Sequence, residues 1–446
     1  MAGMDSRFSV LLSIKIGSFN FGSALVDILT ASVWNRVMIT DLGASATPVA
    51  ILLALRYLLA PLSIWAGFRS DTKPIGGLRR TPYIWMGRAL MLLAVFLLPI
   101  SLAQLSLDLG NPIGWMLALA IFIAYGAGTA ISGGPFLALI HDCTPVAKRG
   151  LAISIAQTLL LLGFAISPIV FGRLLPTYSP EQFQSLAILT GIAAALFWFF
   201  AIVREDHQVT MAEVDQLVER PRLGVMLKRM WADRRARRFA VFLSLGAIAS
   251  FAQDAVLEPF GGDVFGMNVE QTTRFSAYFG TGVLVLMIIT AVVTRKRRPE
   301  QQARPAVIGL SVMIAGLALL ALAGLALMRW MIIPALLVFG GGFGVYTIGG
   351  VSLLMAMTTE KEAGAYLGLW TMIQLVSRGV GIGLGGVVRD VMLALTGSQA
   401  LAYSSVFILE AIGLAVCIAL VLRLDVVGFV RQQQGGEFAA AYALAD

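Results

Sequence analysis

Charged side chains are scarce in this sequence: Lys, Arg, Asp and Glu make up 13% of its 446 residues, whereas about 25% is usual in soluble domains. Hydrophobic residues, by contrast, make up 58% of the chain. A soluble protein of this length would form two or three domains, and each would need a polar surface that this composition cannot supply. The scarcity of charge therefore excludes water as the main solvent and identifies an integral membrane protein.

Cysteine and histidine are also rare, with two of each. Cys143 and Cys417 lie in different apolar segments, which excludes a disulfide framework and a cysteine metal site. His141 lies at the end of an apolar segment, and its imidazole could ligate a chlorophyll magnesium, although a histidine near a loop is more often a plain polar residue. No metal-ligand spacing, nucleotide-binding loop or hydrolase triad is present, so we expect no enzymatic activity.

The apolar residues form long uninterrupted runs. A hydrocarbon core about 30 Å thick needs about 20 such residues per helix, and runs without polar alternation exclude a β-barrel. We predict an all-α integral membrane protein with twelve transmembrane helices. The predicted spans are approximately 15–40, 46–68, 82–104, 113–140, 150–172, 183–203, 239–261, 272–294, 305–328, 331–357, 363–388 and 399–423.

Basic residues are distributed unevenly about these spans. Most of the 33 Lys and Arg residues fall in the two termini and in the loops after even-numbered spans. The opposite side holds only Arg173, Arg274, Arg329 and Arg389. Cytoplasmic loops carry such an excess, so both termini are predicted to be cytoplasmic. The excess of basic loop residues that sets the topology also accounts for the net charge of +8. Because the sequence contains no nucleic-acid-binding motif, we expect no nucleic-acid partner.

The longest polar stretch divides the chain into two sets of six spans. We predict an N-terminal half (1–203), a basic cytoplasmic linker (204–238), a C-terminal half (239–423) and a cytoplasmic tail (424–446). The halves resemble each other weakly: Asp27 lies in the first span much as Asp254 lies in the seventh. Two related six-helix halves are typical of the major facilitator fold.

The loop after the second span supports this fold. Gly67, Asp71, Arg79 and Arg80 resemble a stretched form of the signature that major facilitators carry between their second and third helices. An aspartate at a helix end and a basic cluster could latch two helices together on the cytoplasmic side. Such a signature indicates the fold and does not indicate the substrate.

Ionisable residues inside the spans are candidate functional groups, because charge is costly in the membrane. They are Asp27, Arg36, Arg56, Asp254, Glu258, Arg378 and Glu410. Asp254 and Glu258 are four residues apart and are predicted to share a helix face. Two interpretations of this pair are possible. The two carboxylates could form the proton-coupling site of a transporter. They could instead be ion-pair partners of Arg56 or Arg378, because buried arginines need counter-charges.

Residues 253–267 form the most unusual stretch of the sequence. Pro259 disfavours helical geometry at Glu258, and two glycines follow, so we expect the seventh span to end in a tight, irregular turn. That turn would present Glu258, Asp263 and backbone carbonyls at the non-cytoplasmic mouth, and the first span ends comparably around Asn35 and Arg36. Such oxygen groups could ligate the magnesium of a large apolar pigment without histidine.

The run Leu-Glu-Pro-Phe-Gly-Gly-Asp-Val-Phe-Gly-Met at 257–267 resembles the hallmark of the PucC/LhaA group, the bacteriochlorophyll delivery family of the major facilitators. Residues 35–38, 73–84 and 364–370 also resemble that family, and the likeness extends essentially from 17 to 423. The resemblance implies a role in photosynthetic membranes, in the assembly of light-harvesting complexes and in the handling of bacteriochlorophyll. One subgroup is named a bacteriochlorophyll synthase accessory chain.

We therefore predict a non-enzymatic factor of the bacterial inner, intracytoplasmic photosynthetic membrane that binds (bacterio)chlorophyll and delivers it to antenna polypeptides. The reaction centre or pigment-synthesis enzymes are further candidate partners. The predicted pigment site contains Asn35, Arg36, Glu258, Asp263 and His141, and the predicted buried charge network contains Asp27, Arg56, Asp254, Arg378 and Glu410. The alternatives are a proton-coupled transporter of a small solute and a pigment-free docking protein for antenna or reaction-centre subunits.

Overall fold

The structure is a computed structural model that describes residues 9–145, 148–206, 231, 234–294, 303–356 and 363–422. Within these ranges, the side chains of 234–236, 303, 351–356 and 363–368 are not described. Most of the predicted linker, His207 included, and the predicted tail lie outside the described residues.

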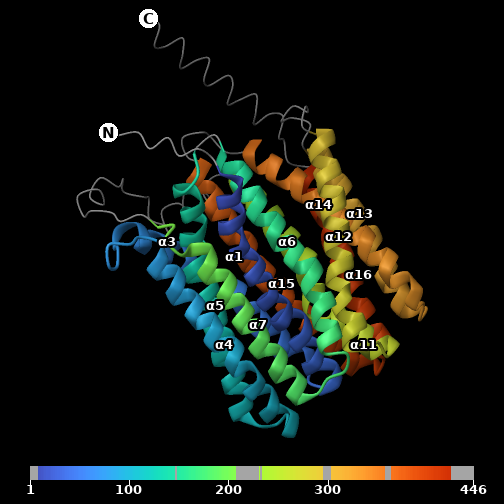
Figure 1. The fold of residues 1–446 in the computed structure, drawn as a ribbon. Helices are drawn as coiled ribbons and strands as arrows, with labels where there is room; N and C mark the ends of the chain where they lie inside the picture. Colours follow the sequence, from blue (N-terminus) through green and yellow to red (C-terminus); the bar gives the residue numbers. More distant parts are fainter. Residues whose placement is uncertain are drawn as a thin grey trace, which may run out of the picture. The chain divides into compact units, whose positions relative to one another are not determined.

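Helices make up nearly all of the described chain, which contains no strand (Figure 1). The α-helices are α1 (Val10–Ile28), α2 (Ala46–Leu58), α3 (Pro61–Thr72), α4 (Thr81–Leu107), α5 (Pro112–Asp142), α6 (Arg149–Leu174), α7 (Pro180–Ile202), α10 (Arg234–Phe251), α11 (Leu257–Phe265), α12 (Val269–Thr294), α13 (Ala303–Leu325), α14 (Ile332–Ala356), α15 (Ala363–Thr396) and α16 (Gln399–Leu422).

The prediction of twelve membrane spans is confirmed. Eleven helices of the described residues are long and apolar enough to cross a membrane, and α2 with α3 counts as one of them. The predicted twelfth span corresponds to a bent pair, Arg237–Ala255 with Leu257–Phe265, whose two parts meet at 42° and pass the same test when they are counted as one span. Capping residues place several helix ends: Asn111 and Ser179 each accept a backbone N–H at the start of α5 and α7, and a proline follows each of them.

The first span is helical to one residue beyond its predicted end at 40, but its second half is not regular α-helix. It remains helical to Asp41, but Leu29–Trp34 and Val37–Asp41 form π-helical turns. The expected irregular ending around Asn35 and Arg36 is therefore wrong. The chain ends this helix at Gly43, whose positive φ of 71° suits a residue without a Cβ.

The expectation of an irregular turn at 259–262 is also wrong. The break lies earlier, in a single 3-10 turn at Ala252–Ala255, and the conspicuous run at 257–267 forms the short helix α11. Glu258 and Pro259 occupy the first turn of α11, where a backbone N–H has no helical partner and proline therefore costs no hydrogen bond. Gly266, with a φ of 62°, ends α11.

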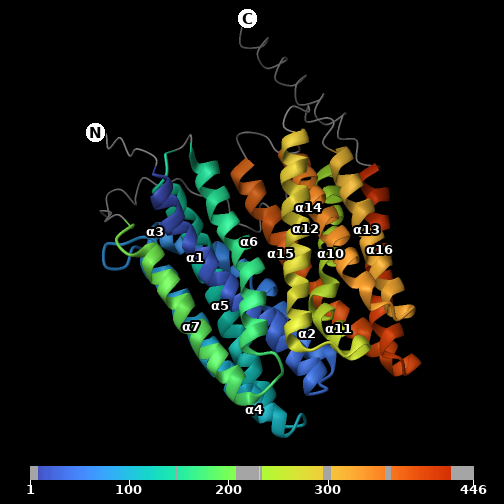
Figure 2. The same cartoon turned by 45° about the vertical axis from the view of Figure 1, so that its right-hand side comes forward.

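The chain forms two compact units, which we describe separately. Unit 1 consists of Met1–Arg220, Gln253–Ala277 and Ile382–Gln399. Within it, α1 packs against α6 and α7, and α4 packs against α5 and α7 (Figures 1 and 2). Glycines allow the closest approach: a Cβ on Gly87 of α4 would lie 2.5 Å from the Gly128 oxygen of α5.

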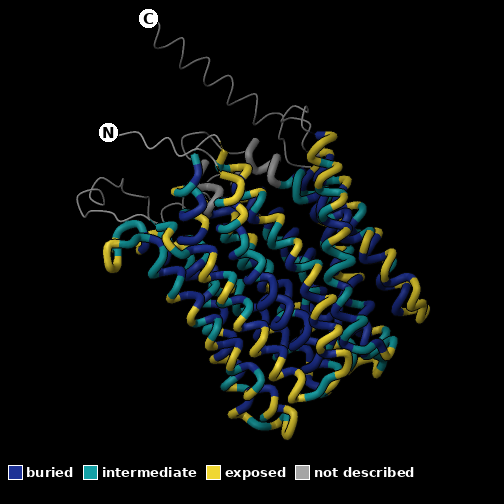
Figure 3. Tube along the Cα trace, in the orientation of Figure 1, coloured by how far each residue is buried: buried dark blue, intermediate teal, exposed yellow. Residues whose placement is uncertain are grey.

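The outer faces of these helices carry apolar side chains. On α7, Leu189, Leu196, Phe199 and Phe200 are exposed, and Figure 3 shows exposed residues along the outward faces of the helices. The core of unit 1 is aromatic: Trp34, Trp198, Phe19 and Phe122 are fully buried. Apolar groups on both the inner and the outer faces are expected of a bundle that is surrounded by lipid.

Unit 2 consists of Pro221–Ala252, Tyr278–Gly381 and Ala400–Asp446. In it, α13 and α14 lie side by side along their lengths (Figure 2). Gly309 and Gly316 of α13 and Gly349 of α14 stand where a Cβ would collide with the backbone of the neighbouring helix. Small residues at such positions allow membrane helices to pack closely.

Candidate functional site

Three ionisable side chains meet in the interior of unit 1. Arg56 on α2 donates from Nη2 to Asp27 Oδ2 on α1 at 2.7 Å. The Tyr125 hydroxyl on α5 donates to the other Asp27 oxygen. The Arg56 guanidinium also lies 5.1 Å from the Tyr57 ring centre. The sequence predicted Asp27 and Arg56 as buried charges, and the structure shows that they are partners of each other.

Glu258 lies where α11 approaches the π-helical part of the first span, and it is 4% exposed. Its Oε1 accepts hydrogen bonds from the hydroxyls of Ser32, at 2.8 Å, and Ser276, at 3.0 Å. Two hydroxyl donors stabilise a buried carboxylate without neutralising it. The predicted alternative paired Glu258 with Arg56 or Arg378; in the structure Arg56 pairs with Asp27, and Glu258 accepts from the two serines.

The expectation that Asp254 and Glu258 share one helix face is wrong as well. Asp254 belongs to the 3-10 turn and Glu258 to α11, so no continuous α-helix connects them. Asp254 Oδ1 instead accepts a hydrogen bond from Gln253 at 3.1 Å.

Asn35 and Arg36 connect the π-helical part of the first span to the segment around α11. The Asn35 amide donates to the Ala255 carbonyl at 2.9 Å and thereby pairs a backbone oxygen at the break in the seventh span. Arg36 forms an ion pair with Asp41 and donates to the Met267 carbonyl at 2.9 Å. Asn35 is fully buried, and its Oδ1 has no hydrogen-bond partner within the described part of the chain.

Asp263 is held by an arginine that the sequence analysis placed in a loop. Arg389 near the end of α15 donates to Asp263 at 3.0 Å and to Asp390 at 2.8 Å. Asp390 in turn accepts the backbone N–H groups of Ala46 and Thr47, at 3.0 and 2.7 Å, and so caps the start of α2. Asp263 was expected at an open mouth, but its side chain is only 9% exposed.

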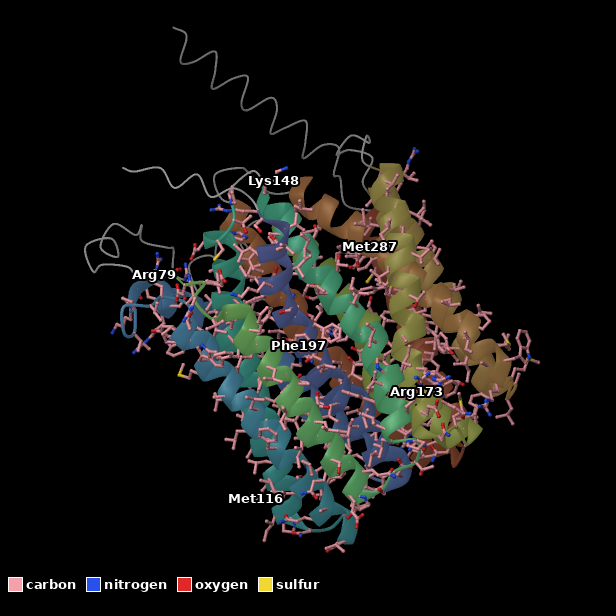
Figure 4. The ribbon with its side chains drawn as sticks, in the orientation of Figure 1. Arg79, Met116, Lys148, Arg173, Phe197 and Met287 are labelled. Atoms are coloured by element: carbon pink, nitrogen blue, oxygen red, sulfur yellow. The ribbon has the colours of Figure 1, made fainter. Side chains whose placement is uncertain are left out.

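The residues of the predicted latch form a polar cluster at one end of unit 1. Arg80 forms ion pairs with Asp71 and, at 3.0 Å, with Asp142, while Arg79 lies 3.4 Å from Asp71. Asp206 accepts the Arg80 and Thr81 backbone N–H groups, both at 2.8 Å. Burial would lower the pKa of Arg80, but Asp71 and Asp142 outweigh it and raise the pKa. Figure 4 shows Arg79 and Lys148 at this end and Met116 at the other.

Two further predicted residues are Gly67, which was assigned to the latch, and His141, which was assigned to the pigment site. Gly67 on α3 is half-buried and has no described atom close to where a Cβ would be. His141, in the last turn of α5, has a buried Nε2 without a hydrogen-bond partner among the described residues. Cys143, two residues further on, donates to the Glu205 carbonyl, and burial raises the pKa of its thiol to about 12. Within the described residues, no three His, Cys, Asp or Glu side chains group as metal ligands.

Two predicted charges belong to unit 2. The Arg378 guanidinium lies 4.0 Å from the Phe251 ring centre, which is a favourable cation–π distance. Glu410 on α16 is 3% exposed.

Sequence reasoning missed one intramembrane arginine altogether. Arg88 lies seven residues inside α4 and is 4% exposed, yet it was not among the predicted intramembrane charges. Its position within the predicted span 82–104 was sufficient to identify it. Arg389 and Asp390 were missed for a different reason, because their contacts join segments that are far apart in the sequence.

Comparison with known proteins agrees with the family resemblance noted in the sequence. A "Protein PucC" of Rhodobacter capsulatus is 29% identical over 444 residues, which are 95% of this chain and 94% of that protein. A "Bacteriochlorophyll synthase 44.5 kDa chain" of the same species is 28% identical over 386 residues, covering 85% of this chain and 87% of that protein. A "Protein PucC" of Rhodovulum sulfidophilum is 29% identical over 401 residues, covering 87% of each.

Solved transporters share the fold. A bacterial homologue of the human lysosomal transporter Spinster has a TM-score of 0.69 at 14% identity, covering 96% of this chain and 99% of its own. The nucleoside transporter NupG, as a D323A mutant, also has a TM-score of 0.69 at 13% identity, covering 93% and 100%. These likenesses establish the major facilitator fold. The PUCC protein family matches residues 33–429, and this chain is a member of that family.

Proposed function

We propose that this chain is a membrane assembly factor for photosynthetic complexes that binds (bacterio)chlorophyll and passes it to light-harvesting polypeptides. The observation that carries the proposal is the family match over residues 33–429, together with relatives named for PucC and for bacteriochlorophyll synthase along most of their length. The multi-pass helical fold suits a ligand with a long apolar tail, since such ligands bind among apolar side chains with a few polar groups.

Two oxygen groups of unit 1 are the best candidates to meet the pigment magnesium. Glu258 is a buried carboxylate that accepts hydrogen bonds from two serines, and the Asn35 Oδ1 is a buried carbonyl without a partner among the described residues. Magnesium prefers such oxygen ligands. Arg36 and Asp263 are engaged in ion pairs and would position this region, whereas His141 belongs to the latch end of the unit.

Pigment content tests this proposal. The wild-type protein, purified in mild detergent from a pigmented host, is expected to retain about one pigment per chain. Glu258→Gln should retain less, whereas the control Glu270→Gln, which alters a half-exposed carboxylate paired with Arg274, should retain the wild-type amount. Purified protein without pigment, together with normal antenna levels in a deletion strain, would refute the proposal.

The second candidate function is proton-coupled transport of a small solute. The transporter fold and the buried Asp27–Arg56–Tyr125 cluster favour it, because buried ionisable groups serve as proton relays in transporters. Uptake into proteoliposomes that depends on a pH gradient and is lost in Asp27→Asn or Asp254→Asn would select this function. Cross-linking to antenna polypeptides without any bound pigment would instead select a docking role.

Location and orientation complete the proposal. We place the protein in the bacterial intracytoplasmic membrane, with the end that carries Arg79 and Lys148 facing the cytoplasm (Figure 4). The excess of basic residues in the corresponding loops supports this orientation. Cysteines introduced at Lys148 and at the exposed Asp108, between α4 and α5, should be labelled by a membrane-impermeant maleimide from opposite sides, and labelling of Asp108→Cys from the cytoplasmic side would overturn the assignment.

A further inference from the structure

The outer face of α3 (Trp65, Phe68, Arg69 and Lys73) combines aromatic with basic side chains. The first three share one side of the helix by their spacing, and Lys73 follows at its C-cap. All four residues are exposed, Trp65 by 46% and Phe68 by 53%. The Arg69 guanidinium lies 5.5 Å from the Trp65 ring centre. Ser70, on the other side of α3, is fully buried, and α3 packs against α5.

Arg69 and Lys73 have no acidic partner within the described residues. Asp71, which lies between them in the sequence, forms ion pairs with Arg79 and Arg80. An aromatic ring attracts a guanidinium but does not cancel its charge. The outer face of α3 therefore carries two positive charges that the described part of the chain does not neutralise.

The order of these side chains along α3 matches the layers of a bilayer. The span Ala46–Thr72 ends with α3, and its 27 residues make it about 40 Å long. The hydrocarbon core is about 30 Å thick, so the end of α3 extends beyond it. Arg69 and Lys73 lie closer to that end than Trp65 and Phe68. The aromatic rings can therefore meet acyl chains while the basic groups meet lipid headgroups.

The loop after α3 holds Lys73 in place. Ile75 and Leu78 exchange two backbone hydrogen bonds, at 3.0 and 3.1 Å. The two glycines at 76–77, both with positive φ, join them in a tight turn. The Tyr83 hydroxyl on α4 donates to the Lys73 carbonyl at 2.8 Å. A surface that is ordered before binding loses less conformational entropy when a ligand binds.

We propose that the outer face of α3 binds an anionic phospholipid, whose phosphate meets Arg69 and Lys73 and whose acyl chain lies along Trp65 and Phe68. Charge complementarity selects a negative headgroup, because basic residues next to a membrane span attract anionic lipids. Inorganic phosphate carries the same charge but has no apolar part to cover the two aromatic rings, so the ligand is a lipid. The inference goes beyond the proposed function and does not depend on bound pigment.

Quenching of Trp65 fluorescence by brominated lipids tests the proposal. The full-length protein is placed in phosphatidylcholine nanodiscs with increasing fractions of dibrominated phosphatidylglycerol or dibrominated phosphatidylcholine. The Trp65 signal is the difference between each protein and the same protein with Trp65→Phe. Half-quenching should need at least about tenfold less phosphatidylglycerol than phosphatidylcholine, since each basic residue near an anionic lipid contributes about fivefold. Equal quenching by the two lipids would overturn the proposal.

Variants assign the lipid preference to the two basic residues. Arg69→Gln should reduce the preference for phosphatidylglycerol by about fivefold, and Arg69→Gln combined with Lys73→Gln should abolish it. The control Lys148→Gln removes an exposed positive charge from the same end of unit 1 and should leave the preference unchanged. An unchanged preference in the double variant refutes the assignment.

A photo-reactive residue distinguishes a polypeptide occupant from a lipid. Benzoylphenylalanine in place of the exposed Phe68, irradiated in the native membrane, should form its main adduct with phospholipid. A polypeptide as the main adduct would show that a protein covers this face, and the lipid assignment would then be wrong.

Discussion

Replacing Arg56 with methionine should destabilise the protein by about 3–5 kcal/mol, which is the cost of removing one partner from a buried ion pair. In the native protein, Asp27 is bound by Arg56 and by Tyr125, and its side chain is 11% exposed. Without the guanidinium, a carboxylate in a membrane span would keep only the tyrosine hydroxyl as a partner. Tyr125→Phe removes the weaker donor and should cost less, about 1.5–3 kcal/mol.

A double variant tests whether the cost comes from the unpaired charge. Asp27→Asn combined with Arg56→Met removes both charges, so the pair should be less destabilised than the sum of the single variants by about 0.5–3 kcal/mol. The control Arg69→Met removes an exposed arginine near Trp65 on the same span and should change stability by less than about 0.5 kcal/mol.

Reversible unfolding in mixed micelles, titrated with dodecyl sulfate, provides the free energies. Each variant should first elute as a single monodisperse species, so that aggregation is not counted as unfolding. A loss below about 1 kcal/mol in Arg56→Met, or strict additivity in the double variant, would show that Asp27 does not depend on Arg56.

Three other parts of unit 1 give separate predictions. Asp390→Ala removes the cap of α2, so the amides of Ala46 and Thr47 should exchange with solvent about tenfold faster or more, as measured by hydrogen exchange and mass spectrometry. Cys143 should react about a thousandfold more slowly with maleimide at neutral pH than an ordinary thiol, because its raised pKa of about 12 leaves little thiolate. Gly87→Leu should abolish recovery of folded protein, because its side chain would collide with α5.

Matched controls accompany these variants. Asp108→Ala removes a carboxylate that caps only the exposed turn at Gly110 and should leave exchange at α2 unchanged. Denatured protein should label at both cysteines at the rate of a free thiol. Gly133→Leu changes a glycine with open space beside it and should give the wild-type yield. The reasoning on each pair fails if the control behaves like the test variant.

The sequence was sufficient to predict the helices that span the membrane, because length and continuous apolarity decide that property locally. All twelve predicted spans correspond to helices or to the bent pair of the structure. Motif resemblance likewise predicted the fold and the family. Local reasoning failed where a short-range rule depended on the start of a helix: Pro259 was treated as a helix breaker, although it lies in the first turn of a new helix.

The partners of the buried charges could not be predicted. Arg56 reaches Asp27 across 29 residues, Glu258 reaches Ser32 across 226 and Asp390 reaches Ala46 across 344. Each pairing depends on which helix faces lie together after folding, and a single sequence does not encode that in any local pattern. Arg88 is different, because its position within the predicted span 82–104 was visible in the sequence itself.

The π-helical turns of the first span also bear on how this segment can change during evolution. A π turn accommodates one residue more than an α turn, so deleting one residue within Leu29–Trp34 or within Val37–Asp41 would return that turn to α geometry and leave the helix faces on its two sides in register. The same deletion in the regular helix α1 would instead rotate everything on one side of it by about 100° relative to the other. Asp27 and Arg36, on either side of the first π turn, would keep their present neighbours only in the first case. Single-residue length variation within this span should therefore be confined, across the family, to the two π turns.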